Sequence, residues 1–169
     1  PKKEYDALRQ CISLCRTEGI TFVYGLNPSF TIEDGGERFD AHVDRIEKKL
    51  MQVARLGVRS FCILYDDIPY AYNILAGERA KNDARIGLLH ARILNEIVYR
   101  MQKYSEDFWF CPSDYFFHTH TPYIDAVISA LSPDIALLWT GPHVFTKHIT
   151  PSMLRDARKI IGKKRRLVL

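Results

Sequence analysis

Amphipathic helical patterns and short apolar runs alternate five times along the chain. Apolar residues recur every three or four positions in four segments, and a fifth helix is bounded by a Thr-Pro start and a glycine. The helical segments are residues 5–15, 39–53, 81–104, 124–131 and 150–162, and the runs that follow them are residues 21–26, 61–66, 108–111, 135–139 and 167–169. Such alternation predicts an α/β fold with a parallel sheet built from right-handed crossovers.

The second apolar run ends in two adjacent carboxylates, Asp66 and Asp67. Parallel α/β folds place ligand sites at the carboxyl ends of their strands, and barrel enzymes place catalytic groups there. Asn27, Tyr115 and Thr140 follow other strands in the same way, which favours a barrel over a doubly wound sheet. No glycine-rich phosphate turn follows the first strand. Five strands cannot close an eight-stranded barrel, so we expect the other strands to lie outside this chain.

Length, composition and charge limit the classes of protein to which the chain can belong. Its 169 residues suffice for one domain, and 47% hydrophobic and 12% aromatic residues exclude a disordered chain. Its apolar runs are too short to cross a membrane. The net charge is 24 minus 20, or +4, and residues 163–166 alone supply four positive charges. We therefore expect neither a nucleic-acid nor a membrane partner, and we expect that basic run to be a solvated loop.

The four cysteines, Cys11, Cys15, Cys62 and Cys111, lie within helix or strand patterns and not at zinc-site spacings. We expect them to be buried and reduced, with no metal site and no cofactor. The chain begins with Pro1 rather than Met and shows no secretory leader, so we expect a processed or partial chain.

Three motifs in order resemble strand-end motifs of the family 84 glycoside hydrolases, the β-N-acetylglucosaminidases that include the O-GlcNAcases. They are residues 61–68 (FCILYDDI), 111–115 (CPSDY) and 138–144 (LWTGPHV), and residues 22–29 resemble the strand before the aspartate pair. The chain departs from the family pattern at Ser29, where glycine is usual, and at Asp114, where glutamate is usual. The resemblance implies that residues 1–169 are the central part of a TIM (β/α)8 barrel, roughly its strands 3 to 7.

The resemblance also implies a retaining, substrate-assisted hydrolase that removes terminal β-linked N-acetylglucosamine through an oxazoline intermediate. The sugar's own acetamido oxygen attacks the anomeric carbon in such enzymes, so two protein carboxyl groups suffice. By position in the motif, Asp66 matches the acid that orients the acetamido group and Asp67 matches the general acid/base. Adjacent carboxylates push their proton affinities apart, which would keep one of them protonated near neutral pH.

The expected substrate is a glycoprotein or glycan that carries N-acetylglucosamine. Tyr115 matches the tyrosine that closes the sugar pocket, Cys111 would lie low in that pocket as a small buried residue, and Thr140 and Val144 would line its rim. Trp139 is expected in the core. Several sugar-binding segments of the family are absent, so we expect little or no activity from this chain alone. The resemblance leaves open a homodimer of the full-length parent and its compartment, cytoplasmic and nuclear for animal-type members or secreted for bacterial ones.

Two other functions remain as alternatives at this point. His118 and His120, two residues apart near the same strand ends, are compatible with a metal-dependent hydrolase on a similar barrel. A non-catalytic barrel that binds a glycan or a protein partner would also fit, although an intact aspartate pair argues against the loss of catalysis.

Overall fold

The computed structural model describes residues 2–28, 37–66 and 76–169 and contains a single five-stranded sheet. Every strand is parallel to its neighbours, and the spatial order β1-β2-β3-β4-β5 follows the sequence. The strands are β1 (Val23–Leu26), β2 (Ser60–Leu64), β3 (Asp107–Cys111), β4 (Ala136–Leu138) and β5 (Leu167–Val168). The predicted parallel α/β fold, the central part of a (β/α)8 barrel, is confirmed.

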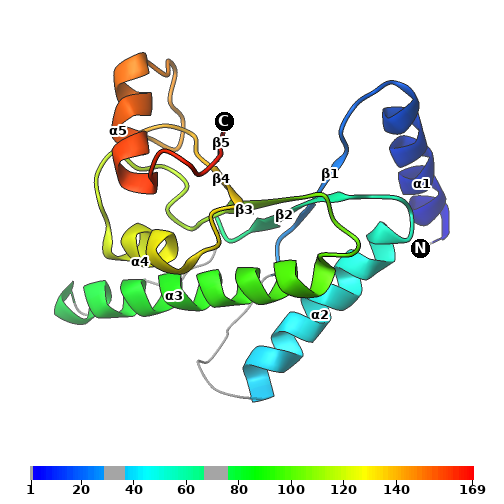
Figure 1. The fold of residues 1–169 in the computed structure, drawn as a ribbon, viewed down its shortest axis with the longest axis horizontal. Helices are drawn as coiled ribbons and strands as arrows, with labels where there is room; N and C mark the ends of the chain where they lie inside the picture. Colours follow the sequence, from blue (N-terminus) through cyan, green and yellow to red (C-terminus); the bar gives the residue numbers. More distant parts are fainter. Residues whose placement is uncertain (1, 29–36, 67–75) are drawn as a thin grey trace.

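A helix precedes each strand, and all five helices contribute side chains to the hydrophobic core on one side of the sheet. The helices are α1 (Lys2–Thr17), α2 (Glu37–Ala54), α3 (Ala76–Met101), α4 (Pro122–Ala130) and α5 (Pro151–Ile161). The long α3 runs between α2 and α4, whereas α1 stands apart beside β1 (Figure 1). The opposite face of the sheet would line the interior of a closed barrel.

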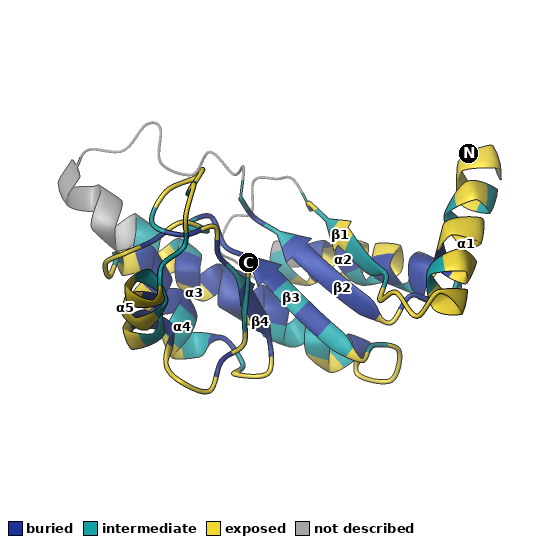
Figure 2. Cartoon of the chain, turned by 90° about the horizontal axis from the view of Figure 1, so that it is seen from above, coloured by how far each residue is buried: buried dark blue, intermediate teal, exposed yellow. Residues whose placement is uncertain are grey.

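Residue alternation along the strands separates these two faces. Phe61, Ile63, Phe108 and Phe110 are at most 5% exposed and join the core beneath the helices. Their neighbours along the strands belong to the other face, where the register aligns Gly25 with Cys62, Cys62 with Trp109, and Trp109 with Ala136. Buried residues are concentrated in the central strands and on the helix sides next to them (Figure 2).

Local signals in the sequence set several helix ends correctly. Thr121 and Thr150 cap α4 and α5 by accepting hydrogen bonds from the backbone N–H of Ile124 and Met153, and a proline follows each cap. Gly57 has a φ of +100° just after α2, a backbone conformation that favours glycine and ends the helix.

The long helix α3 begins at Ala76, earlier than the predicted start near Lys81. Gly77 lies in this first turn, where a glycine costs little because its N–H has no partner within the helix. At Gly87 the helix passes so close to α4 that a Cβ atom would lie 2.5 Å from the carbonyl oxygen of Tyr123. Helix α3 is therefore packed directly against the start of α4.

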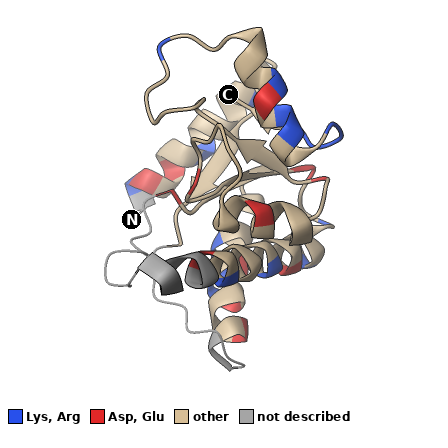
Figure 3. Ribbon diagram, turned by 90° about the vertical axis from the view of Figure 1, so that its left-hand side faces the viewer, with Lys and Arg blue, Asp and Glu red and all other residues tan. Residues whose placement is uncertain are grey.

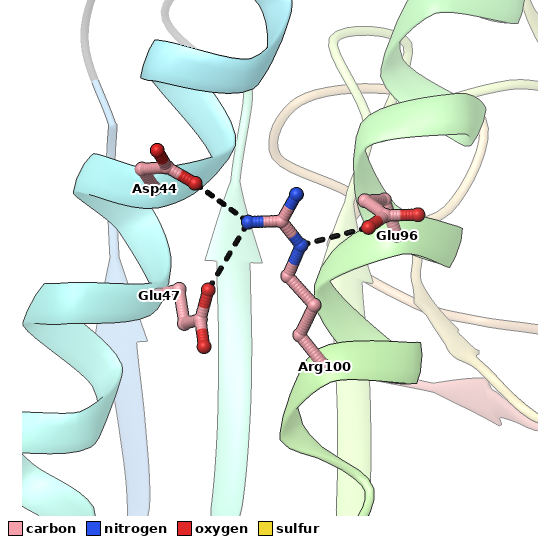
Figure 4. Close-up of polar contacts among 4 residues, drawn as sticks. All are labelled: Asp44, Glu47, Glu96 and Arg100. Atoms are coloured by element: carbon pink, nitrogen blue, oxygen red, sulfur yellow. Dashed lines mark hydrogen bonds and ion pairs between the residues drawn. The ribbon is translucent and has the colours of Figure 1, made fainter.

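A charged cluster joins α2 to α3 on their outer side (Figure 4). Arg100 Nη1 lies 2.6 Å from Asp44 Oδ1 and 3.2 Å from Glu47 Oε2, and Arg100 Nε lies 2.7 Å from Glu96 Oε1. Three carboxylates hold the pKa of the Arg100 guanidinium above its usual value, and the hydrogen bond that Arg100 donates to Glu96 contributes most. The ion pairs from Arg100 to Asp44 and Glu47 link α3 to α2.

The expectation that all four cysteines are buried is wrong for α1. Cys62 and Cys111 are buried in the sheet, but Cys11 is exposed and Cys15 is only partly covered; all four are free thiols. In α1 only Leu8 and Ile12 reach the core, while Leu14 is 61% exposed. The amphipathic spacing predicted the helix correctly, but it could not specify how much of the apolar stripe the rest of this chain would cover.

The basic run before β5 is also not a purely solvated loop. Arg165 is 5% exposed and donates hydrogen bonds to the carbonyl oxygens of Leu131, Ser132 and Ile135, where it satisfies the end of α4 and the turn after it. Arg166 pairs with Asp107 at the start of β3. Only Lys163 and Lys164 remain exposed without such a role.

Charged residues of both signs lie mainly on the helices and loops (Figure 3). Within the described ranges, no helix is both long and apolar enough to cross a membrane.

Candidate functional site

Asp66 lies in the turn just beyond the carboxyl end of β2. The strand stops at Leu64, but the ladder continues for one more bond, from Tyr65 N–H to the carbonyl oxygen of Cys111 at 2.8 Å. Asp66 Oδ1 is buried and accepts no hydrogen bond from the described part of the chain. A buried carboxylate oxygen without a donor is costly, so this atom is a candidate for contact with a ligand. Asp67 lies outside the described residues.

Two buried cysteines lie on the inner sheet face near Asp66. Cys111 is the last residue of β3 and is 7% exposed, and Cys62 is 4% exposed in the adjacent strand. Burial, together with the nearby Asp66 carboxylate, raises the pKa of the Cys62 thiol to about 12. Cys62 therefore stays a protonated thiol at neutral pH and cannot serve as a nucleophile.

Backbone hydrogen bonds join the loop that contains Tyr115 to the residues just after β4. Thr140 N–H donates to the carbonyl oxygen of Tyr115 at 3.0 Å, and Phe117 N–H donates to that of Gly141 at 3.2 Å. The indole N–H of Trp139, a residue only 1% exposed, donates to the carbonyl oxygen of Phe117. These bonds bring Tyr115 and Thr140 together at the same sheet end as Asp66, and they confirm that Trp139 belongs to the core.

The turn after Thr140 is tightly built around Gly141. Gly141 has a φ of +105°, and a Cβ atom there would lie 2.3 Å from Thr146 Oγ1, so no other residue fits without rearrangement. Thr140 Oγ1 donates to the carbonyl oxygen of His143, which also accepts from Thr146. Val144, beyond this turn, is 38% exposed. Thr140 and Val144 are thus both accessible at the strand mouth, whereas Cys111 is almost covered.

A buried polar cluster behind Asp66 was not identified from the sequence. It consists of Tyr65, His90, Ser113 and Tyr123, each at most 8% exposed. Ser113 lies within the CPSDY motif, and His90 lies on the apolar stripe of α3 between Ile86 and Ile97. A histidine on a core-facing stripe is the one sequence signal that could have identified this cluster.

His42 and His90 are both buried behind β2 and stay neutral. Burial, with Arg45 nearby, lowers the pKa of His42 to about 4, and burial, with His42 nearby, lowers the pKa of His90 to about 3. Each unfolded histidine takes up a proton near pH 6.5, so between that pH and the folded pKa the unfolded state binds more protons. Acid therefore destabilises the fold. The stability that the two neutral histidines contribute is complete only above about pH 6.5 and is lost as the pH falls.

We expect the free energy of unfolding to fall by about 1.4 kcal/mol per pH unit for each histidine as the pH drops below about 6. Denaturant titrations of the protein at pH 6.5, 6.0 and 5.5 measure this slope. The variant His42→Gln, which removes one titrating group, should show a clearly shallower slope than the wild-type domain. Equal slopes in the two proteins would contradict the lowered pKa of His42.

The remaining polar side chains near the strand ends are engaged in local structure. Asp114 Oδ2 accepts from Thr121 Oγ1 at 2.6 Å, so this aspartate supports the cap of α4. His120 Nδ1 lies 2.6 Å from Asp125 Oδ1, and the rings of His118 and His143 are 6.5 Å apart. Across residues 2–28, 37–66 and 76–169 there is no group of three or more residues that could hold a metal ion.

A hollow of about 630 Å³ lies at the opposite end of the sheet, at the amino ends of β3 and β4. Its lining mixes both charges, including Asp107, Asp134, Lys164 and Arg166. Because barrel enzymes bind their substrates at the carboxyl ends of the strands, we place the candidate site at Asp66 and not in this hollow.

Comparison with known proteins identifies a single family. The sequence profile described as β-N-acetylglucosaminidase matches residues 1–169. The Protein O-GlcNAcase of Rattus norvegicus and that of Mus musculus are each 34% identical over 168 residues, which cover 95% of this chain and 18% of each relative. The chain thus spans less than one fifth of the length of these curated relatives.

Two solved structures have the same fold. The structure of CpGH84B superposes with a TM-score of 0.82 at 22% identity and covers 99% of this chain and 29% of that one. A mutant of the O-GlcNAc hydrolase from Thermobaculum terrenum gives a TM-score of 0.80 at 20% identity, covering 99% of this chain and 35% of the other.

Proposed function

Because the chain belongs to the β-N-acetylglucosaminidase family, we propose that it carries the catalytic acids of a glycoside hydrolase that removes β-linked N-acetylglucosamine from a glycoprotein or glycan. The observation that carries this proposal is Asp66, whose buried Oδ1 accepts no hydrogen bond from the residues described and which lies at the carboxyl end of β2. The substrate's acetamido N–H is a donor of the right kind for that oxygen.

In the proposed mechanism, the carbonyl oxygen of the 2-acetamido group attacks the anomeric carbon while the bond to the leaving oxygen breaks. Asp67 gives its proton to the leaving oxygen, and Asp66 accepts a hydrogen bond from the acetamido N–H and balances the positive charge of the forming oxazoline. Water then attacks the anomeric carbon and gives a proton to Asp67, while the oxazoline C–O bond to that carbon breaks and the 2-acetamido group is restored. Two displacements at the same carbon retain its configuration.

The proposal assigns further residues to the sugar pocket. Tyr115 would close the pocket over the acetamido group, with Cys111 below it and Thr140 and Val144 at the rim. The hydrogen bond from Thr140 N–H to the Tyr115 carbonyl oxygen supports placing Tyr115 and Thr140 in the same pocket.

We further propose that residues 1–169 form roughly strands 3 to 7 of a larger barrel and have little activity alone. Two observations support this: β1 and β5 each pair with only one strand of the described sheet, and the chain spans 18% of its curated relatives. A sheet with two open edges leaves the interior of the barrel incompletely enclosed.

The test is to compare an aryl N-acetyl-β-glucosaminide with the matching aryl β-glucoside as substrates of the complete protein. We expect cleavage of the acetamido substrate only, because the glucoside lacks the internal nucleophile, and no loss of rate after chelation. Isolated residues 1–169 serve as a second sample and should show no comparable turnover. If the folded complete protein cleaves neither substrate, the non-catalytic binding barrel replaces this proposal; if chelation abolishes cleavage, the metal-dependent hydrolase does.

A further inference from the structure

The buried cluster behind Asp66 joins four separate elements in a closed ring of contacts. Tyr65 follows β2, His90 belongs to α3, Ser113 follows β3, and Tyr123 belongs to α4. The rings of Tyr65 and His90 stack with their centroids 4.1 Å apart, and His90 Nδ1 lies 2.8 Å from the hydroxyl oxygen of Tyr123. The Tyr123 hydroxyl accepts from Ser113 N–H at 3.1 Å, and Ser113 Oγ donates to the Tyr65 carbonyl oxygen at 2.6 Å.

The last of these bonds acts directly on the backbone of the candidate catalytic residue. The carbonyl group of Tyr65 belongs to the same planar peptide unit as the N–H of Asp66, so the plane that Ser113 holds also fixes the direction in which the chain enters Asp66. On the other side of Tyr65, its own N–H donates to the Cys111 carbonyl oxygen at 2.8 Å. Both peptide units around Tyr65 are therefore tied to the end of β3, although the strand itself has already ended.

Ser113 is in turn held by Tyr123 of α4, which is contacted by His90 of α3. Its backbone N–H bonds to Tyr123, and Tyr123 is oriented by His90. Burial lowers the pKa of His90 to about 3 and raises the pKa values of Tyr65 and Tyr123 well above their usual range. All three rings therefore stay uncharged near neutral pH, and the cluster acts through geometry and not through charge.

A buried polar cluster of this kind stabilises the folded state less than apolar side chains of the same volume would. Buried polar groups contribute little net stability when they are satisfied, and they cost stability whenever one partner is missing. What they supply is one defined geometry, because directional bonds exclude the alternative packings that an apolar core permits. Here that geometry is imposed on the peptide unit that precedes Asp66.

We propose that Ser113 is a positioning residue for Asp66, and that His90 and Tyr123 hold the Ser113 hydroxyl in place for this role. The inference rests on the proposed function of Asp66. A carboxylate that must meet the acetamido N–H in the transition state loses rate steeply when it is displaced, and a 1 Å misplacement costs about 100-fold. The hydroxyl of Ser113 prevents such a displacement without touching the substrate.

The test uses three variants of the complete protein. We expect Ser113→Ala to lower kcat about 10- to 100-fold with KM nearly unchanged. Ser113→Thr, which keeps the hydroxyl, should restore most of the rate. The matched control is Ser105→Ala, because Ser105 Oγ also donates to a backbone carbonyl, that of Met101 at 3.0 Å, but lies at the other end of the sheet; its activity should equal that of the wild-type protein.

A second readout separates positioning from a purely structural role. A thiazoline that mimics the oxazoline intermediate should lose affinity for Ser113→Ala in parallel with kcat, whereas the product N-acetylglucosamine should bind almost as before. Parallel losses for both ligands would indicate general damage to the pocket and would overturn the proposal.

If Ser113→Ala does not fold, Tyr123→Phe tests the same idea, since it keeps the packed ring and removes the hydroxyl that accepts the Ser113 N–H. We expect a several-fold loss of kcat, and an unchanged kcat would overturn the positioning role. An inactive wild-type protein would instead overturn the proposed function and, with it, this inference. An active wild-type protein with a fully active Ser113→Ala would overturn the inference alone.

Discussion

Replacing Asp67 by Asn should lower kcat/KM of the complete protein about 10²- to 10⁴-fold on substrates with poor leaving groups. Under the proposed mechanism Asp67 provides the proton without which an alkoxide would have to leave, and an amide of nearly the same shape cannot provide it. A highly acidic phenol leaves without protonation, so a dinitrophenyl glycoside should lose much less of its rate for bond cleavage.

The measurement compares Asp67→Asn with the wild-type protein on two N-acetyl-β-glucosaminides, one with a dinitrophenyl leaving group and one with an unactivated phenyl group. Asp156→Asn provides a control, because Asp156 is an exposed carboxylate of α5 that pairs with Lys159; it should behave as the wild-type protein does. Equal losses on both substrates would argue against a role in proton transfer.

Replacing Asp66 by Asn is expected to lower kcat by about 10²- to 10³-fold, with a dependence on the substrate unlike that of Asp67→Asn. Under the proposed mechanism Asp66 acts on the acetamido group and not on the leaving group, so the loss should be similar for the dinitrophenyl and phenyl glycosides. The amide still has an oxygen that can accept a hydrogen bond, but it has lost the negative charge that balances the developing oxazoline.

The stability of Asp66→Asn provides an independent check. Asp66 Oδ1 is buried and accepts no bond from any residue that the structure describes, so exchanging the carboxylate for a neutral amide should leave the melting temperature unchanged or raise it. A variant that is inactive and at least as stable as the wild-type protein fits a residue kept for catalysis. A variant that retains its activity would remove Asp66 from the mechanism.

Much of the fold could be predicted because its signals are local. The Thr-Pro start and the terminal glycine of α5 could be read from the sequence, because caps and positive φ angles depend on a few neighbouring residues. The position of Asp66 after β2 followed from one apolar run and the directionality of parallel sheets.

The features that could not be predicted depend on contacts between distant segments. Arg165 looked like one of four solvated basic residues, yet it is buried against carbonyl groups more than 29 positions earlier in the chain. The ring of contacts around Ser113 joins four elements, and no periodicity in one segment encodes it. Asp67, which the motif identifies as the general acid/base, lies outside the described residues, so its role remains a prediction from sequence.

The order of the strands has a consequence for how the protein is made. Each strand from β2 to β5 pairs with the strand synthesised just before it, and β1 pairs with β2. No strand of the described sheet must wait for a distant partner, so loop closure is needed only across one helix at a time. The sheet can therefore grow strand by strand while the chain leaves the ribosome, with each new helix and strand adding to an edge already formed.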